Sequence, residues 1–317
     1  MIFWALRRAA TLLVQVWIVA TVVFLALHVV PGDPAELLLS GSGTAPDPAA
    51  VDELRSKLGL DQPLLAQYGS FLQGVVRANL GASMVDDTPV LDEIALRLPR
   101  TLELIGGGVL IAAVLAVPAG TLAALRAGGP LDRALSGLAA LLLSVPVFVV
   151  GTLLVLVLAQ WLRVLPAGGY VPFARDPGRH LLLLLMPALA IAQGLTAVLF
   201  RMTRTSVLDV LNRDFVRTAR AKGLHPRRIM ARHVLRNALT PVVTVLGLHM
   251  GGLLGGTVLV EYVFNWPGLS TPLLDAVSAR DYPMVVGIVL TVSVLFLLLN
   301  LLMDVAYAVL DPRIRAA

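Results

Sequence analysis

The chain has 317 residues, of which 57% are hydrophobic and only 14% are charged, and it contains no cysteine. Soluble domains carry roughly 25% charged residues, so this composition excludes an ordinary cytosolic enzyme, a disordered chain and a disulfide-stabilised secreted scaffold. The net charge of +5 matters less than the positions of the charges. We therefore expect an integral membrane protein.

Six apolar stretches are long enough to cross a bilayer, which requires about 20 apolar residues in a helix. They are residues 9–30, 104–125, 134–161, 181–200, 240–260 and 284–303. The first stretch is too long for a signal peptide and lacks an A-x-A cleavage site, so it is predicted to be an uncleaved anchor. Pro118, Pro146 and Pro187 interrupt the second, third and fourth spans and indicate kinks, which are hinges or static bends.

Basic residues are distributed unequally between the two sides of the predicted membrane. If the amino terminus faces the cytoplasm, the inner segments hold 16 of the 25 Lys and Arg residues but only 5 of the 20 acidic residues. Because positive charge accumulates in cytoplasmic loops, six spans with both termini in the cytoplasm are predicted.

The segment between the first two spans, residues 31–100, is too long for a simple connector and has ten acidic residues against five basic ones. Apolar residues at helical spacing predict helices over 52–60 and 63–76, broken by Gly59 and Pro63. Residues 41–49 are rich in Gly, Pro and Ala and are predicted to form a loop. The whole segment is expected on the extracytoplasmic side.

The segment between the fourth and fifth spans is the most charged part of the chain, with ten basic and two acidic residues between Arg201 and Arg236. Gly223 followed by Pro226 is a helix stop, so one helix is predicted before this point and another after it. Asp214 lies near the start of the first helix, where the helix dipole favours a negative charge. One face of that helix carries Arg213, Arg217 and Arg220, another carries Phe215, Ala219 and Lys222, and the second helix has a stripe of Arg228, Arg232 and Arg236.

Two interpretations of these helices stay open. A cationic helix can lie on the inner leaflet and attract anionic lipid headgroups, which accounts well for the second helix. The first helix has small residues among its charges, notably Thr218, Ala219 and Gly223, and this pattern favours insertion into a cleft of another protein. Nucleic-acid binding is disfavoured, because aromatic residues do not alternate with the basic ones.

Residues 214–224 (DFVRTARAKGL) and 232–241 (RHVLRNALTP) resemble the cytoplasmic coupling loop of ABC-importer permeases, and the branch they resemble is the dipeptide/oligopeptide/nickel family, first permease subunit. The resemblance covers nearly the whole chain. Its other motifs, in order, are PGDP at 31–34, LGLDQP at 58–63 with Gln67 and Tyr68, NLGAS at 79–83, PV at 89–90, RLP at 97–99, EYVFNWPGL at 261–269, RDYP at 280–283 and LDPRIR at 310–315.

The loop departs from the general importer pattern, E-A-A-x-x-x-G followed by I-x-L-P. Ala219, Gly223 and Leu235 are kept, whereas Arg217 stands at the Glu position and His233 and Arg236 stand at the Ile and Pro positions. This departure resembles the peptide branch, and it leaves open which side chains meet the ATPase.

The resemblance implies an all-α integral membrane protein of the cytoplasmic (inner) membrane, with the type-1 importer permease fold. It implies a first helix plus extracytoplasmic loop at 1–100, a permease domain at 101–307 with its coupling loop at 201–239, and a cytoplasmic tail at 308–317. The implied coupling helix presents Asp214, Phe215, Arg217, Thr218, Ala219, Lys222 and Gly223 to an ATPase.

The same resemblance implies a division of labour among subunits. The sequence contains no P-loop and no nucleophile or metalloprotease motif, so the chain is expected to have no catalytic residue, no metal and no cofactor of its own. ATP and Mg²⁺ would be held by two partner ATPase subunits or domains. The other implied partners are a second homologous permease subunit, an extracytoplasmic binding protein and membrane lipid. The outer segment 31–100 would then help to dock the binding protein, or it is only a cap on the spans.

Few polar groups lie inside the spans: Gln15, His28, Gln160, Gln193, His249 and Asn300. His249 is near the middle of its span and is a candidate pathway-lining residue, the alternative being a hydrogen bond between helices. Gly251 and Gly255 recur at four-residue spacing with Gly247, which favours either static helix packing or a pore-lining surface. The five histidines do not cluster, and Asp304 is expected to pair with a nearby Arg.

The implied cargo class is short peptides, and nickel, glutathione and opine-like solutes belong to relatives on the same scaffold. A self-sufficient ion-coupled carrier is the main alternative from another class. It requires mid-membrane carboxylates and inverted repeats, and neither is found in the sequence. A membrane-embedded hydrolase would need a nucleophile and base deep in the spans, and no such pair can be assembled.

Overall fold

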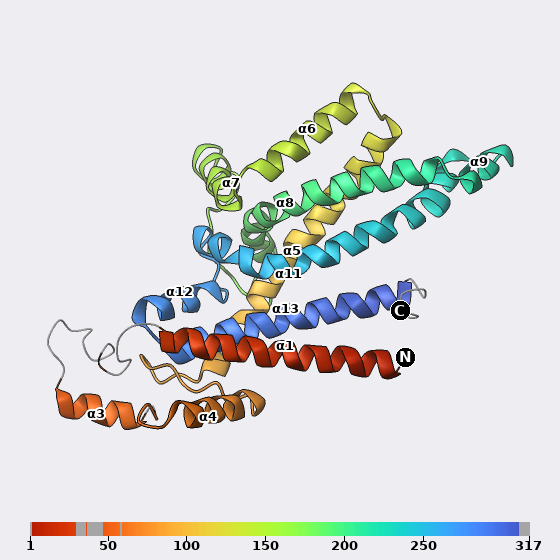
Figure 1. Ribbon diagram of the computed structural model, residues 1–317. Coiled ribbons are helices and arrows are strands. Elements are labelled where there is room, and N and C mark those ends of the chain that lie inside the picture. Colours follow the sequence, from red (N-terminus) through yellow and green to blue (C-terminus); the bar gives the residue numbers. More distant parts are fainter. Residues whose placement is uncertain (1, 30–35, 37–46, 58, 311–317) are drawn as a thin grey trace. The chain divides into compact units, whose positions relative to one another are not determined.

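The computed structural model describes residues 2–29, 36, 47–57 and 59–310 (Figure 1). These residues form helices joined by turns and loops, and the β-type pairing among them is an isolated bridge between Ala82 and Pro89. The predicted all-α fold class is therefore confirmed. The PGDP motif at 31–34, most of the predicted loop at 41–49 and the side chains of His28 and Asp304 lie outside the described part.

The chain divides into two compact units, one of Met1–Pro99 with Gly268–Leu298 and the other of Arg100–Pro267 with Leu299–Ala317. This is a different division from the one expected from the sequence at residues 100 and 307, which stays a prediction. The helices of the first unit are α1 (Ile2–Val29), α3 (Pro48–Lys57), α4 (Leu64–Val76), the start of α5 (Val90–Leu125), α12 (Ser270–Ala279) and most of α13 (Tyr282–Leu310).

The second unit contains most of α5 and the elements that follow it. These are α6 (Pro130–Ser144), α7 (Val147–Leu154), the π-helix η2 (Val155–Trp161), α8 (Pro177–Leu211), α9 (Asp214–Ala221), α10 (Pro226–Arg228), the π-helix η3 (Ile229–Leu235) and α11 (Arg236–Val263). α10, η3 and α11 follow one another without a break, so the predicted second cationic helix is the beginning of the fifth span.

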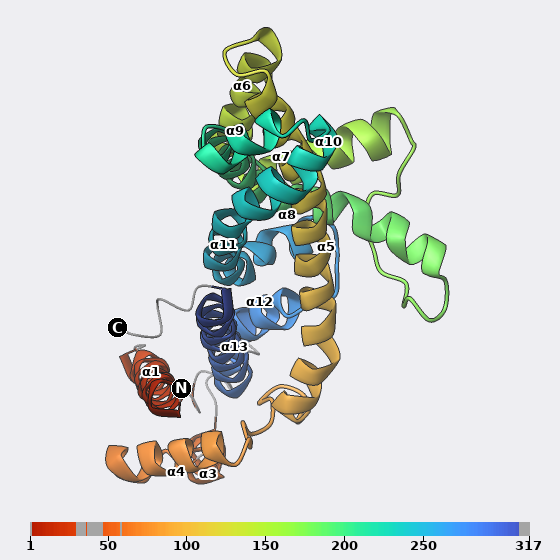
Figure 2. The same cartoon turned by 90° about the vertical axis from the view of Figure 1, so that its right-hand side faces the viewer.

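Among the residues that the structure describes, four helices are long and apolar enough to cross a membrane: α5, α8, the α10–α11 run and α13 up to Leu302. α6 and the α7–η2 run pass the same test as a pair, bent by 104° (Figures 1 and 2). In α1 the apolar stretch is Ala10–Ala26. The structure thus supports a multi-span protein, while the count of six stays a prediction.

The three prolines of the predicted kinks behave differently. α5 continues through Pro118 and α8 continues through Pro187, whereas the third span breaks completely at Pro146. Proline lacks an N–H group and clashes with the carbonyl four residues before it, so each proline weakens its helix. A full break at only one of them indicates that the surroundings decide the outcome.

The two helices predicted in the outer segment are confirmed with shifted ends. α3 begins at Pro48, before the predicted start at residue 52, and α4 begins at Leu64 after Pro63. Gly59, between them, has a φ angle of +68°, a left-handed conformation that glycine adopts at little cost. α4 contacts α1 of the same unit, where the Thr21 and Tyr68 hydroxyl oxygens lie 2.6 Å apart.

A buried carboxylate joins distant segments of the first unit by hydrogen bonds. Asp281 lies between α12 and α13, accepts a hydrogen bond from the Ser83 hydroxyl at 2.6 Å and another from the Met84 backbone N–H at 3.2 Å. Around it, Val90 and Ile94 of α5 pack against Ile288 of α13 in one apolar cluster. The RDYP motif at 280–283 therefore joins the end of α12 to the NLGAS motif at 79–83.

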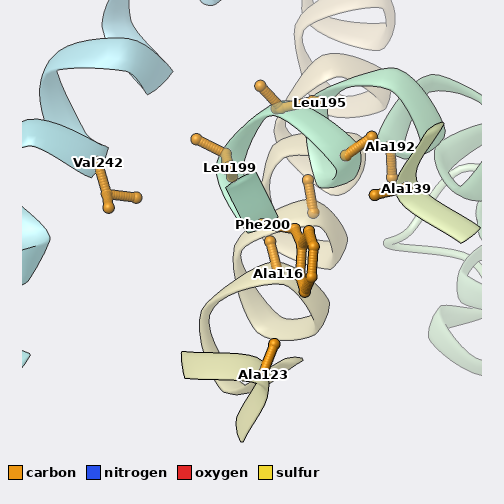
Figure 3. Packing of buried hydrophobic residues seen from close by; sticks show 10 residues of the cluster. Ala116, Ala123, Ala139, Ala192, Leu195, Leu199, Phe200 and Val242 are labelled. Atoms are coloured by element: carbon orange, nitrogen blue, oxygen red, sulfur yellow. The ribbon is translucent and has the colours of Figure 1, made fainter. Parts of the chain in front are cut away.

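α5 and α8 approach each other through glycines of α5. A Cβ atom on Gly108 would lie 2.6 Å from Cγ2 of Ile191, and one on Gly120 would lie 2.8 Å from the Phe200 carbonyl oxygen. Figure 3 shows the same contact region, with the Phe200 ring against Ala116 of α5 and Ala192 facing Ala139 of α6. Small residues thus bring α5, α6 and α8 into one closely packed core.

Candidate functional site

The coupling segment folds as its local sequence predicts. α9 spans Asp214–Ala221 and ends at Lys222, and Gly223 has a φ angle of +72°, the left-handed conformation common after a helix end. Pro226 then begins α10. Asp214 occupies the first turn, where the exposed backbone N–H groups favour a carboxylate. The predicted helix stop between the two cationic helices is confirmed.

One face of α9 is buried within this chain. Val216 is fully buried and Ala219 is 4% exposed. They belong to an apolar cluster with Val207 of α8, Ala124 of α5 and several residues that follow α9, namely Ile229, Val234 and Ala238. α9 is therefore held on the ends of three longer helices by side-chain packing, although it has only eight residues.

The opposite face of α9 is open. The side chains of Asp214 and Arg217 are 97% and 72% exposed, and their charged groups lie 3.7 Å apart. Phe215 is 45% exposed, and Thr218, Lys222 and Gly223 are also exposed. Six of the seven residues predicted for the coupling role thus share the accessible side, while Ala219 belongs to the buried face.

A groove of about 450 Å³ lies at the amino-terminal end of α9. It is lined by Val210 at the end of α8, by Arg213, Asp214 and Phe215, and by Asn237 of α11. The exposed aromatic ring therefore lies at the edge of a recess that has both charged and apolar walls. An aromatic anchor beside charged groups is typical of protein–protein contact sites.

A second candidate site is a half-open cavity of about 410 Å³ in the second unit. Its walls are the break between α6 and α7, the middle of α8 and the middle of α11. His249 lines this cavity, as do Gly252 and Gly256. Of the two glycines predicted to line a pathway, Gly251 is buried in the helix packing, and Gly255 is exposed but is not among the residues that line this cavity.

Gln193 of α8 is the polar group that joins the cavity to the helix break. Its Nε2 donates hydrogen bonds to the carbonyl oxygens of Leu142 at 3.2 Å and Val145 at 2.7 Å. Its Oε1 is buried and, among the residues that the structure describes, has no hydrogen-bond partner. The sequence identified Gln193 as one of several polar residues inside a span, but nothing in the sequence linked it to Pro146.

The sequence does not predict the partly buried ion pair between α6 and α8. Asp132 at the start of α6 accepts two hydrogen bonds from Arg204 of α8, with oxygen–nitrogen distances of 2.6 and 2.7 Å. In the sequence Arg204 is one of the ten basic residues between Arg201 and Arg236, and Asp132 lies between Arg126 and Arg133. The one sequence signal for this pair is an isolated carboxylate among basic residues, and this signal does not identify Arg204 as its partner.

A cluster of packed aromatic rings lies at the end of the second unit that is opposite to α9. Trp266 donates its indole N–H to the Arg100 carbonyl oxygen at 3.0 Å, and its ring meets Tyr170 edge to face at 5.0 Å. The buried His180 ring lies 5.8 Å from Trp266, with its Nε2 atom 2.7 Å from Oε1 of Glu103. Within the described residues no three His, Asp or Glu side chains gather as metal ligands.

The comparisons with known proteins agree along the chain. The sequence profile of the family described as "Binding-protein-dependent transport system inner membrane component" matches residues 116–316, and the profile of its N-terminal region matches residues 1–105. The glutathione transport system permease protein GsiC of Escherichia coli O6:H1 (strain CFT073) is 41% identical over 315 residues, covering 99% of each chain. GsiC of E. coli strain K12 is 40% identical over 315 residues, again covering 99% of each chain.

Two solved structures have the same fold in their permease region. Both are inward-facing forms of the MetNI methionine ABC transporter. The first has a TM-score of 0.55 at 18% identity and covers 70% of this chain and 98% of that chain. The second has a TM-score of 0.53 at 18% identity, with 69% and 94% covered. The type-1 permease fold and the resemblance inferred from the motifs are thereby confirmed, and the protein belongs to the binding-protein-dependent transport system inner membrane components, the non-catalytic multi-pass permease subunits of ABC importers.

Proposed function

We propose that this permease receives the ATPase-driven movement through the exposed face of α9. The observation that carries the proposal is the two-sided structure of that helix. Val216 and Ala219 fix it to the ends of the spans, while Phe215, Arg217 and Thr218 are accessible to a partner. A short helix attached in this way transmits a push to the spans, because its buried side cannot slide without breaking the packing.

The solute pathway is proposed to pass the cavity lined by His249, Gly252 and Gly256. A Cβ atom on Gly252, Gly255 or Gly256 would meet no described atom within 4 Å, so these glycines have no close packing role within the described chain. The exposed face of α11 continues with Leu248, Leu259 and Tyr262. We assign this face to the pore and to the second, homologous permease subunit.

The proposed assembly contains this chain, the sister permease, two ATPase subunits or domains that hold ATP and Mg²⁺, and an extracytoplasmic binding protein, within membrane lipid. Members of the family work with ATPase and substrate-binding partners in general. Both termini are proposed to be cytoplasmic, since this arrangement places the basic α9–η3 segment on the inside. α3 and α4 then lie outside, where they would help to dock the binding protein.

The proposed cargo is short peptides, and glutathione is the first peptide to test because GsiC relatives 40–41% identical to this chain are named for it. Nickel and opine-like solutes are the remaining alternatives on this scaffold. An ion-coupled carrier is no longer supported, since the family belongs to ATP-driven importers.

The test uses the transporter purified with its partner subunits and reconstituted into vesicles, with uptake of labelled glutathione, a dipeptide panel and Ni²⁺ as readouts. Thr218→Trp places a large side chain on the exposed face of α9 and should abolish uptake and ATPase co-elution without lowering membrane insertion. Ser278→Trp, an exposed hydroxyl residue of α12, is the matched control. Full uptake by Thr218→Trp would exclude docking through this face.

A further inference from the structure

Two polar clamps join α6 to α8, one at each end of α6. The first joins Asp132 to Arg204, and the second joins the last turn of α6 to Gln193. Gln193 and Arg204 are eleven residues apart, which is about three helical turns, so they lie on one face of α8 about 16 Å apart. Residues 132 and 142 of α6 are about 15 Å apart, so the two antiparallel helices match in length between the clamps.

The first clamp is specific and largely shielded from solvent. Asp132 is 4% exposed and holds the Arg204 guanidinium through both carboxylate oxygens. The same carboxylate accepts the Gly128 backbone N–H at 2.8 Å, which ties the α5–α6 turn to the pair. The Arg204 side chain is 30% exposed, so the buried charge of the pair is that of Asp132. Removing Arg204 would leave this carboxylate buried and uncompensated, which favours keeping the two helices together at this end.

The second clamp supplies the hydrogen-bond donor that the helix lacks at Pro146. In a helix the Leu142 carbonyl would accept the N–H of residue 146, which proline lacks. Nε2 of Gln193 supplies the missing donor to Leu142 and a second one to Val145, whose carbonyl follows the end of α6. An unsatisfied carbonyl is costly in an apolar membrane interior, so Gln193 stabilises the break and also fixes its position against α8.

Between the clamps the contact is made of small residues and one aromatic ring. Ala139 of α6 packs with Ala192, Ala197 and Phe200 of α8 in the same core cluster (Figure 3). Small side chains allow close approach and leave little room for one helix to tilt against the other. α6 and α8 are therefore joined along their shared length and at both ends.

The joined pair of α6 and α8 connects α9 to the cavity proposed for the solute. α8 ends at Leu211, and α9 begins three residues later and packs on Val207 of α8. At the other end, the α6–α7 break forms part of the cavity wall. We propose that Gln193 and Arg204 are positioning residues that make α6 and α8 one lever, so that displacement of α9 moves the break at Pro146. The proposal rests on the coupling function proposed for α9.

The first test removes each clamp in the reconstituted transporter and measures glutathione or dipeptide uptake per ATP hydrolysed. Arg204→Gln and Gln193→Leu should each lower this ratio by about tenfold, because a buried partner is left unsatisfied and the helices separate. Arg201→Gln makes the same exchange at an exposed position of α8, three residues before the clamp, and Gln160→Leu makes the same exchange at an exposed position of η2. Both controls should keep the parent ratio, and unchanged ratios in both clamp variants would overturn the proposal.

The second test replaces the clamps with a covalent bond. The chain contains no cysteine, so Ala139→Cys with Ala192→Cys introduces one unique pair in this subunit. Cross-linking should preserve uptake in the otherwise unchanged chain and should restore it in Arg204→Gln, an effect that a general loss of stability would not show. If cross-linking stops uptake, α6 and α8 must move against each other and the lever is wrong.

A third measurement needs no transport. Spin labels at Leu138→Cys on α6 and Thr205→Cys on α8, both exposed positions, report the distance between the helices in the solubilised chain. The distance distribution should be narrow in the parent and broad in Arg204→Gln, and equal widths would overturn the clamps even if no solute were transported. Failure of the α9 function would instead appear as full uptake by Thr218→Trp with the clamps intact.

Discussion

The two ends of the second unit are built in opposite ways. At one end, Trp266, Tyr170 and His180 are packed ring against ring and tied by hydrogen bonds to neighbouring segments. At the other end, α9 buries only Val216 and Ala219 and leaves its charged face exposed. The comparison teaches that the residues that stabilise the second unit and those of the proposed coupling face are separated in space. We expect substitutions at the aromatic end to unfold the protein, and substitutions on the open face of α9 to spare folding and impair partner binding.

The largest effect is expected at the aromatic end. Trp266→Ala removes a ring that is 1% exposed together with its hydrogen bond to Arg100, and should cost about 3–5 kcal/mol of stability. Thermal melting of the solubilised chain, followed by size-exclusion chromatography, measures the loss. Trp161→Ala, at a residue 73% exposed, is the matched control. Similar melting of the two variants would remove the contrast between the two ends.

The buried face of α9 should give the next largest effect. Ala219→Leu forces three additional carbon atoms against Val207 and Val234, and overpacking of this kind costs about 1–3 kcal/mol. Ala221→Leu makes the same exchange on the exposed side of the same helix and should leave melting unchanged. A destabilised Ala221 variant with a normal Ala219 variant would reverse the assignment of the two faces.

Phe215→Ala tests whether a residue on the open face of α9 serves partner binding and not stability, because its ring is large but 45% exposed. We expect a change in stability of less than about 1 kcal/mol, since much of the ring already lies outside the packing. ATPase co-elution should fall several-fold, because partly exposed aromatic residues are frequent anchors at protein interfaces. Strong unfolding with normal co-elution would assign Phe215 to the fold instead.

The smallest effect is expected for the ion pair between Asp214 and Arg217. Both side chains are highly exposed and lie 3.7 Å apart, so solvent and salt screen their attraction. Asp214→Asn removes this attraction and the interaction of the carboxylate with the amino-terminal N–H groups of α9, and should shift the melting temperature by no more than about 2 °C in 0.15 M salt. A larger, salt-sensitive shift would mean that this face also stabilises the fold.

Local signals explain which parts of the fold were predictable. α9 was predicted because Asp214, Gly223 and Pro226 lie within thirteen residues and mark its start and its end. The apolar length of their sequences predicts α5, α8, α11 and α13, although α5, α8 and α11 extend beyond their apolar stretches by turns with charged residues, which the hydropathy argument excludes. α12 was missed as a separate helix, because the left-handed Arg280 that ends it is not a residue typical of helix termination.

The features of the fold and of the candidate site that the sequence does not predict depend on contacts between residues far apart in the sequence. Pro146 breaks its helix while Pro118 and Pro187 do not, and the donor that stabilises the break comes from Gln193, 47 residues further on. The aromatic cluster draws on four segments, at residues 100–103, 170–171, 180 and 266, and none of them carries a local sign of the others. The inward orientation of Ala219 likewise follows from packing on α8 and η3, which helical periodicity alone does not specify.

The glycine contacts between α5 and α8 limit which substitutions the sequence of α5 can accept. At Gly120 the obstacle to a side chain is main chain, the Phe200 carbonyl oxygen, so no repacking of neighbours can make room even for alanine. Gly106 lies on the same helix, and a Cβ there would meet no described atom within 4 Å. In a saturation library of α5, position 120 should return only glycine among working clones, whereas position 106 should accept many residue types.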